Sequence, residues 1–195
     1  DHLGAQTALA AGWSGGGPHA LAVGALLAGR VQGVACLAGV APYAESAGSL
    51  DFLAGMGQDN LDEFGAAMQG EVPVREYLET VHVEALRVAQ GSEIVEQIGS
   101  LLPEVDRAWV GAEFGDDLAT SFHEALAVSA DGWVDDDLAF VRPWGFDLGA
   151  IAVPVALWQG SEDLMVPFAH GRWLAQAMPR ARAHLLDGDG HLSVV

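Results

Sequence analysis

The stretch GWSGG at residues 12–16 separates an apolar run from a helix-like run, and it decides the fold. Thr7–Ala11 is predicted to form a short buried strand, and Pro18–Ala28 is predicted to form a helix. A Gly-x-Ser-x-Gly turn in that setting is typical of a nucleophile elbow, which exposes a hydroxyl at the tip of a sheet. We expect glycine two residues before and two after Ser14, because the turn leaves little room for side chains. Taken alone, the pattern fits equally well a glycine-rich turn whose serine caps the following helix.

An acid and a histidine late in the chain favour the catalytic interpretation. A serine hydroxyl needs a base to remove its proton, and that base needs a third group to orient it. Val153–Trp158 and Ala181–Leu186 are predicted strands, and Pro167–Met178 between them has the apolar spacing of a helix. Asp163 follows the first of these strands and His191 follows the second. Open α/β sheets place their sites at such strand ends, so these side chains are predicted to meet at one edge of the sheet.

These motifs, in this order, make the chain resemble the α/β-hydrolase fold enzymes. More narrowly, it resembles the members with a helical cap, which include esterases, peptidases, dehalogenases and epoxide hydrolases. The resemblance covers residues 1–42 and 146–195. It is carried by three stretches, which are GWSGGGPHA at 12–20, GSEDLMVP at 160–167 and GDGH at 188–191. The resemblance implies an α/β fold with a partial, mostly parallel α/β-hydrolase sheet and a helical cap insertion.

The resemblance also implies a role for each matching residue. Ser14 is the expected nucleophile, His191 the base and Asp163 the acid that orients it. The backbone N–H of Gly15 is the expected oxyanion donor. Because the nucleophile is a serine, the aspartate-nucleophile chemistry of dehalogenases and epoxide hydrolases is excluded.

The acid role has rivals in the sequence. Glu162 stands beside Asp163 and stays an alternative to it. Asp187 and Asp189 are close to His191, but a residue so near in sequence rarely turns back to hold its neighbour's imidazole.

The resemblance exposes a departure at both ends of the fold. In the family, several strands and a loop with the second oxyanion donor precede the elbow, whereas residues 1–6 alone precede the predicted strand here. The family continues into a last helix after the histidine, whereas this sequence ends at Val195. A parallel sheet cut at that place has an exposed apolar edge. We therefore expect the chain to need a missing N-terminal segment or a companion chain.

The middle of the chain has a helical character. The predicted division is a core segment with the elbow at residues 1–43, a helical cap insertion at 44–145, and a core segment with the acid and base at 146–195. Three stretches in the middle have apolar residues at helical spacing, and these are Pro73–Ala89, Ser92–Leu102 and Asp116–Val128.

Most of the 27 acidic residues also lie in this middle segment. We interpret them as solvated helix faces and helix caps, with Asp116 and Asp117 at a helix start and Asp135–Asp137 in a loop or at another helix start. The alternative is that some of these carboxylates hold a cationic group of the substrate, such as the free amine of a peptide.

Composition narrows the class of protein. The chain has 195 residues, 51% of them hydrophobic, which is enough for a sizeable core. Its net charge is −19 and it has no lysine, so phosphate backbones would repel it and no nucleic-acid partner is expected. The apolar runs are too short and too broken to span a bilayer, so no membrane partner is expected. The one cysteine, Cys36, is predicted to be buried, and a reducing, cytoplasmic location is expected.

No cofactor or metal is predicted. The histidines are scattered and have no spacing typical of metal ligands. Residues 15–20 formally match a dinucleotide-binding pattern, but Leu37–Val40 lacks the acid that such a site needs. The predicted function is therefore a serine hydrolase that cleaves an ester or related carboxyl derivative through an acyl-enzyme. The alternatives are a non-catalytic α/β-hydrolase-like protein that binds a small ligand, and an aminopeptidase-type peptide hydrolase. The sequence does not predict the substrate or the oligomeric state.

Overall fold

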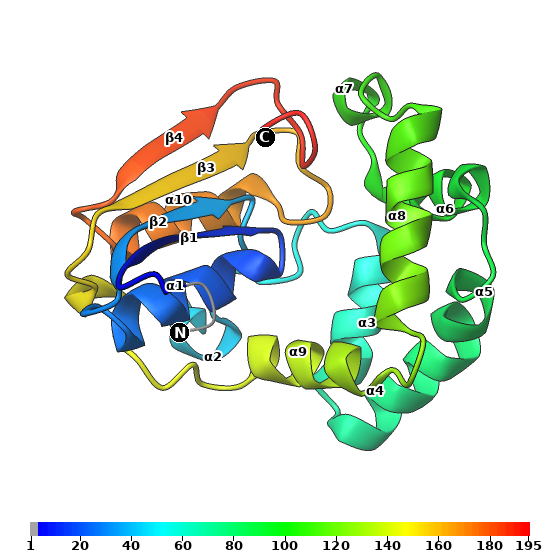
Figure 1. Cartoon of the computed structure of the whole chain (residues 1–195), viewed down its shortest axis with the longest axis horizontal. Coiled ribbons are helices and arrows are strands. Elements are labelled where there is room, and N and C mark those ends of the chain that lie inside the picture. The colour runs from blue at the N-terminus through cyan, green and yellow to red at the C-terminus, as the bar shows by residue number, and fades with distance from the viewer. Residues whose placement is uncertain (1–3) are drawn as a thin grey trace.

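Four parallel strands form a sheet in one lobe of the molecule, and helices make up the other lobe (Figure 1). The computed structural model describes residues 4–195, so residues 1–3 of the predicted first core segment, His2 among them, lie outside the described part. The strands are hydrogen-bonded in chain order, and they are β1 (Ala8–Trp13), β2 (Val31–Leu37), β3 (Val155–Gly160) and β4 (Arg182–Leu186). The predicted α/β class with a mostly parallel sheet is confirmed.

Two helices connect neighbouring strands and pack on one face of this sheet. α1 (Gly16–Leu26) joins β1 to β2, and α10 (Phe168–Ala177) joins β3 to β4. Both helices contribute to one apolar core with the strands (Figure 1). The three strand predictions and both helix predictions in this lobe are confirmed, with ends that differ by a few residues. The strand predicted over Thr7–Ala11 was expected to be buried, which is wrong, because most residues of β1 are exposed.

The core of the sheet lobe is built from the buried positions of the central strands and the facing sides of the helices. Its fully buried members include Leu21, Cys36, Leu157 and Leu174. Cys36 is buried as predicted, and burial raises the pKa of its thiol to about 12. The thiol is therefore protonated at neutral pH and packs as a small apolar group.

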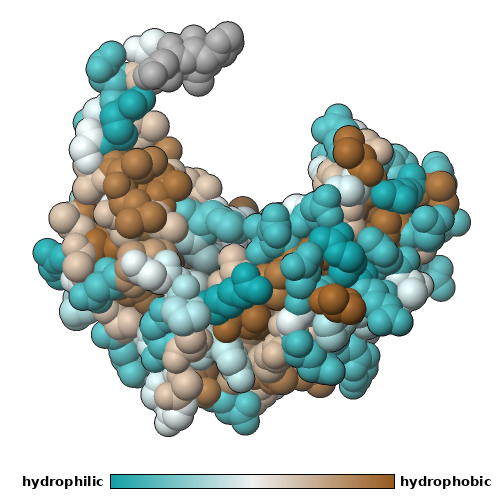
Figure 2. Space-filling model, turned by 90° about the horizontal axis from the view of Figure 1, so that it is seen from below, coloured by the Kyte–Doolittle hydropathy of each residue, from teal (hydrophilic) through white to brown (hydrophobic). Residues whose placement is uncertain are grey.

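The edge strands are far more exposed than the central strands. Most residues of β1 and β4 are exposed, and the side chain of Leu9 on β1 is 79% exposed. Figure 2 shows apolar surface gathered on the sheet lobe, and a hollow between this lobe and the helical one. β1 is therefore an edge strand of largely apolar residues at one side of the sheet, with Leu9 exposed on a face of the sheet beside Gly33.

The second lobe consists of the helices between residues 58 and 141, which we call the helical lobe. Its elements follow one another along the chain as α3 (Gln58–Ala67), α4 (Glu71–Leu78), the π-helical turn η1 (Glu79–Val83), α5 (Glu84–Leu86), α6 (Gly91–Gln97), the 3₁₀ turn η2 (Ile98–Leu101), α7 (Glu104–Arg107), α8 (Ala112–Ala125) and α9 (Asp131–Val141). They enclose an apolar cluster of their own, which includes Val74, Leu78, Ile94 and Val134. The short helix α2 (Tyr43–Ser46) and the 3₁₀ turn η3 (Leu148–Ala150) lie in the segments that lead to and from this lobe.

Some helix predictions were wrong in detail. The helix predicted over Pro73–Ala89 is interrupted by the π-helical turn. α8 begins at Ala112, so Asp116 and Asp117 lie in its second turn and not at its start. Asp135–Asp137 lie inside α9 and not in a loop or at a helix start. The division of the chain at residues 43 and 145 stays a prediction.

A third apolar cluster joins the two lobes. It combines Val40, which follows β2, with Phe140 on α9 and Val166 beyond β3, and it also includes Phe52 and Met56. Between residues 4 and 195, no helix is long and apolar enough to cross a membrane.

The buried position of Leu157 predicts a large effect on stability. We expect Leu157→Ala to lower the free energy of unfolding by about 2–5 kcal/mol, because it leaves a cavity in the centre of the sheet lobe. Leu9→Ala removes the same atoms at a mostly exposed position and is expected to change stability by less than about 0.5 kcal/mol. Urea unfolding of both variants measures the difference, and equal losses would contradict this assignment of the core.

Candidate active site

The turn between β1 and α1 has the strained backbone of a nucleophile elbow. Ser14 has a φ of 54°, a left-handed conformation that is uncommon for a residue other than glycine. A Cβ at Gly12 would overlap the carbonyl of Gly16, so glycine is required there as predicted. The prediction was wrong for Gly16, where a Cβ would meet nothing within 4 Å. Gly15 and Gly17 are restricted as well, because a Cβ would lie 2.9 Å from the ring of Phe140 and 2.8 Å from the Cα of Gly39, respectively.

Backbone hydrogen bonds hold Ser14 at the carboxyl end of the sheet. Its N–H donates to the carbonyl of Leu37 on β2 at 2.8 Å, and its carbonyl accepts from the N–H of Gly17 at 2.9 Å. Gly15 is the N-cap residue, directly before the first residue of α1. The serine is therefore fixed beside the amino end of a helix, where partial positive charge favours a developing anion.

The predicted acid and base are in direct contact. Nδ1–H of His191 donates to Oδ2 of Asp163 at 2.8 Å, and both side chains are fully buried. The same carboxylate accepts hydrogen bonds from the side-chain amide of Gln159 at 2.9 Å and from the N–H groups of Met165 and Val166 at 2.9 and 2.8 Å. Four donors thus fix the orientation of this acid. The acid in turn fixes the tautomer of the imidazole, so Nε2 is left with a free lone pair.

His191 also contacts the residue next to the predicted nucleophile. The indole N–H of Trp13 donates to the carbonyl of His191 at 3.1 Å, and the two rings are 5.1 Å apart. Nε2 of His191 is buried and has no hydrogen-bond partner among the described residues, so Ser14 and His191 are not hydrogen-bonded to each other. The structure therefore brings the acid and base into contact, and it brings the elbow into contact with the base through Trp13.

The rival acids do not reach the imidazole. Glu162 and Asp187 are exposed, and their carboxylates flank the hydroxyl of Ser161. Asp189 contributes its carbonyl, which accepts from the N–H of Glu162 at 2.8 Å.

A second buried carboxylate, which the sequence analysis missed, supports the loop of His191. Asp106 on α7 is 0% exposed and accepts from the N–H of His191 at 2.6 Å. It also accepts from the N–H and the hydroxyl of Ser193 at 2.9 and 2.8 Å. A Cβ at Gly190 would overlap this carboxylate, so glycine is required for the close approach. No sequence signal distinguishes Asp106 from the other acids of the helical lobe.

Two further acids of the helical lobe are not solvated, contrary to the interpretation from sequence. Asp137 on α9 is 3% exposed, and its carboxyl is in hydrogen-bond contact with that of Glu63 on α3. Glu63 also accepts from the indole N–H of Trp133 at 2.7 Å. Burial, together with the neighbouring carboxylate, raises the pKa of Asp137 to about 9, and burial raises the pKa of Glu63. The close pair therefore shares a proton at neutral pH.

Two histidines, His19 and His170, lie on the helices that follow β1 and β3. His170 is fully buried, accepts from the N–H of Ala41 at 3.1 Å and contacts the carbonyl of Phe52 at 2.8 Å. Burial lowers the pKa of His170 to about 4, so it is neutral and braces the segment after β2. His19 is half exposed and lies 3.1 Å from a carboxylate oxygen of Asp136. Among residues 4–195, no group of three or more His, Cys, Asp or Glu side chains is arranged to hold a metal ion.

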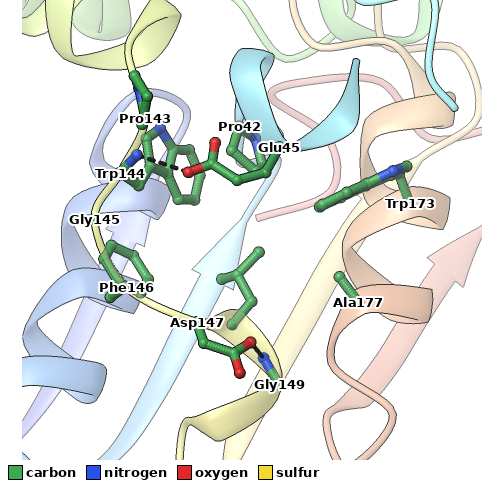
Figure 3. Close-up of a pocket in the computed structure, with 11 residues that line it drawn as sticks. Pro42, Glu45, Pro143, Trp144, Gly145, Phe146, Asp147, Gly149, Trp173 and Ala177 are labelled. Carbon is green, nitrogen blue, oxygen red and sulfur yellow. Dashed lines mark hydrogen bonds between the residues drawn. The ribbon is translucent and has the colours of Figure 1, made fainter. Parts of the chain in front are cut away.

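Ser14, the predicted nucleophile, lines a cavity of about 310 Å³ between the two lobes. Besides Ser14 and Gly15, the cavity is lined by residues from α3, α9 and the segments after β2 and β3, and these include Asn60, Glu63, Trp133, Asp137, Phe140 and Met165. A larger cavity of about 540 Å³ lies elsewhere, against α2 and α10. Figure 3 shows Trp144, Phe146 and Trp173 around it, and it contains none of the three predicted catalytic residues.

Solved structures with similar folds are numerous. An esterase from Rhodococcus sp. ECU1013 matches 97% of this chain with a TM-score of 0.58 at 19% identity. A meta-cleavage product hydrolase from Pseudomonas fluorescens IP01 matches 97% with a TM-score of 0.56 at 18% identity. An alpha/beta hydrolase fold protein from Nakamurella multipartita matches 98% with a TM-score of 0.54 at 22% identity. The chain spans 60%, 60% and 65% of these structures, respectively. No protein-family model and no curated protein matches the sequence.

The contacts of Asp106 predict a stabilising role. We expect Asp106→Asn to lower the free energy of unfolding by about 1–3 kcal/mol, because its amide N–H₂ cannot accept the hydrogen bonds that one carboxylate oxygen accepts now. Glu104→Gln changes an exposed acid on the same helix and is the control. Chemical denaturation compares the two variants, and an unchanged stability of Asp106→Asn would contradict the assigned contacts.

The raised pKa of Asp137 predicts a pH-dependent stability. The folded state binds a proton more tightly than the unfolded state, so this group's contribution to the free energy of unfolding falls as pH rises from about 4 towards about 9. Asp137→Asn removes the group that ionises, so its free energy of unfolding should not fall in this way. The difference in free energy of unfolding between Asp137→Asn and the native protein is expected to favour the variant by at least about 1 kcal/mol more at pH 8 than at pH 5. Asp135 is exposed, so Asp135→Asn should differ from the native protein in free energy of unfolding by the same amount at both pH values. Thermal unfolding at each pH decides between the two patterns.

Proposed function

The chain has the α/β-hydrolase fold, and we propose that it is a serine hydrolase that cleaves an ester or a related carboxyl derivative. The observation that carries the proposal is the buried hydrogen bond from His191 to Asp163, which leaves Nε2 free as a base. The strained turn at Ser14, which is joined to His191 through Trp13, supports it further.

The proposed first step is attack of Ser14 on the carbonyl carbon of the substrate. His191 takes the hydroxyl proton at Nε2, and Asp163 stabilises the imidazolium that forms. The carbonyl oxygen becomes an oxyanion, which the N–H of Gly15 stabilises at the start of α1. Collapse of the intermediate breaks the bond to the leaving group, which takes the proton from His191.

The proposed second step is hydrolysis of the acyl-enzyme. His191 removes a proton from a water molecule, which attacks the acyl carbon, and Ser14 leaves with that proton. The buried carboxylate of Asp163 keeps the imidazole in the same orientation for both steps, since its other three donors hold it in place. The cavity between the lobes is the proposed substrate site, because both Ser14 and Gly15 line it.

We also propose that a further segment or a companion chain covers the outer edge of β1. This edge strand is largely exposed and has an apolar residue, Leu9, that is 79% exposed. An uncovered apolar edge is an aggregation hazard, which favours a partner strand there. The same added strand would bring a loop to the carboxyl end of the sheet, where the second oxyanion donor is needed.

Active-site labelling tests the proposed nucleophile. A fluorophosphonate probe is expected to modify Ser14, with the site identified by peptide mass spectrometry. His191→Ala is expected to abolish labelling, and Asp163→Asn to slow it by about 10²–10⁴, because the imidazole loses its oriented tautomer. Glu162→Gln changes the adjacent exposed acid and should label at the native rate.

Labelling of a residue other than Ser14, or native labelling of His191→Ala, would refute the hydrolase proposal. Turnover of a chromogenic short-chain ester then separates an enzyme from a protein that only binds a small ligand. A ligand-binding protein would bind the ester without releasing the chromophore.

A further inference from the structure

Gln159 on β3 is fully buried, and its side-chain amide makes hydrogen bonds through the nitrogen alone. Nε2 donates to Oδ2 of Asp163 at 2.9 Å and to the carbonyl of Val166 at 2.7 Å. The amide oxygen, Oε1, is buried too and receives no hydrogen bond from the described residues. Both atoms that Nε2 contacts are acceptors, so the reverse orientation of the amide would form neither hydrogen bond. Gln159 therefore supplies two donors at this place and leaves its own oxygen unpaired.

Two unfavourable features keep this amide in place. A buried oxygen without a donor costs free energy, which an apolar side chain would avoid if Gln159 served packing alone. On the facing helix α10, a Cβ at Gly171 would overlap the Cβ of Gln159. Glycine is therefore required inside a helix, where it is less favourable than alanine. Because costly groups of this kind concentrate at functional sites, both features point to a role for the amide beyond packing.

The amide holds the oxygen of Asp163 that binds the base. Oδ1 of this carboxylate accepts from two backbone N–H groups, those of Met165 and Val166. Oδ2 accepts from the side chains of Gln159 and His191. Without the hydrogen bond from Gln159, the position of Oδ2 would depend on the imidazole that Oδ2 orients. The carboxylate could then turn about Oδ1, and the imidazole would turn with it or lose the contact.

We propose that Gln159 is a positioning residue for the acid–base pair, which deepens the proposed function and rests on it. Its N–H holds Oδ2 of Asp163 independently of the imidazole. Nδ1 of His191 therefore keeps its proton, while Nε2 takes up and returns a proton in each of the two proposed steps. Gln159 does not line the cavity of Ser14, so it acts on the reaction through Asp163.

A double-mutant cycle of Ser14 labelling tests this role. Gln159→Met keeps the side-chain volume and removes both donors, and we expect it to lower the maximal rate of fluorophosphonate labelling at least tenfold. The half-saturating probe concentration should stay unchanged, because the cavity is not altered. In the Asp163→Asn background the same substitution is expected to change the rate less than about twofold, because the acid through which Gln159 acts is already lost. Gln176→Met changes an exposed glutamine of α10 and should label at the native rate.

Gly171→Ala is a second variant, which displaces the amide of Gln159 and leaves every polar group in the chain. It is expected to slow labelling in the native background and to have less than about a twofold effect in the Asp163→Asn background. Urea unfolding identifies the variants that are folded, so the cycle can be completed with either substitution at this contact.

Nitrogen NMR of His191 tests the positioning role without labelling. The His191 signals in isotope-labelled protein are identified by their loss in His191→Ala. At a pH where the imidazole is neutral, the native chain and Gln176→Met should show one tautomer, with the proton on Nδ1. Gln159→Met is expected to show a mixture of both tautomers.

A single native tautomer in folded Gln159→Met would overturn the positioning role. Equal effects of Gln159→Met on labelling in the native and Asp163→Asn backgrounds would overturn it as well, because they would show a loss that does not pass through the acid. If Ser14 is not labelled in the native chain and the tautomers behave as expected, the hydrolase proposal is refuted and the positioning of His191 by Gln159 stands.

Discussion

The buried hydrogen bond between Asp163 and His191 is the interaction on which the rest of the site depends. It requires β3 and β4 to be parallel neighbours, because the acid follows one strand and the histidine follows the other. Glycine at position 160 is part of that requirement, since a Cβ there would overlap the carbonyl of Asp189. The register of β3 against β4 therefore sets the distance between Asp163 and His191.

The helical lobe is coupled to the same interaction. Asp106 belongs to that lobe, yet its carboxylate holds the backbone of His191 and Ser193 in the sheet lobe. The imidazole is thus positioned through its ring by Asp163 and through its backbone by Asp106. A change in the packing of the helical lobe around Asp106 would therefore reach His191 without touching the turn at Ser14.

Strands and strand-end residues were predictable from the sequence, whereas the long-range contacts of the helical lobe were not. The apolar runs around β1 and β3 are short and bounded by glycine, which is a local signal. α3 and α9 were missed because acids interrupt their apolar spacing, as Asp137 does inside α9. Its burial depends on a partner, Glu63, that lies far away in sequence, and no local pattern encodes that contact. For the same reason, the sequence distinguished neither Asp106 from the exposed acids nor Gly17 from Gly16.

The carboxyl pair is difficult to explain as a stabilising contact alone. Burial raises the pKa of both acids, so the fold works against their ionisation at neutral pH. An apolar or amide side chain at position 137 would join α3 to α9 without that penalty, because Leu138 and Val134 on α9 already pack in the apolar cluster of the lobe. Strained or costly groups concentrate where a protein binds or reacts. Glu63 and Asp137 both line the cavity that Ser14 lines, so this cost lies at the proposed substrate site.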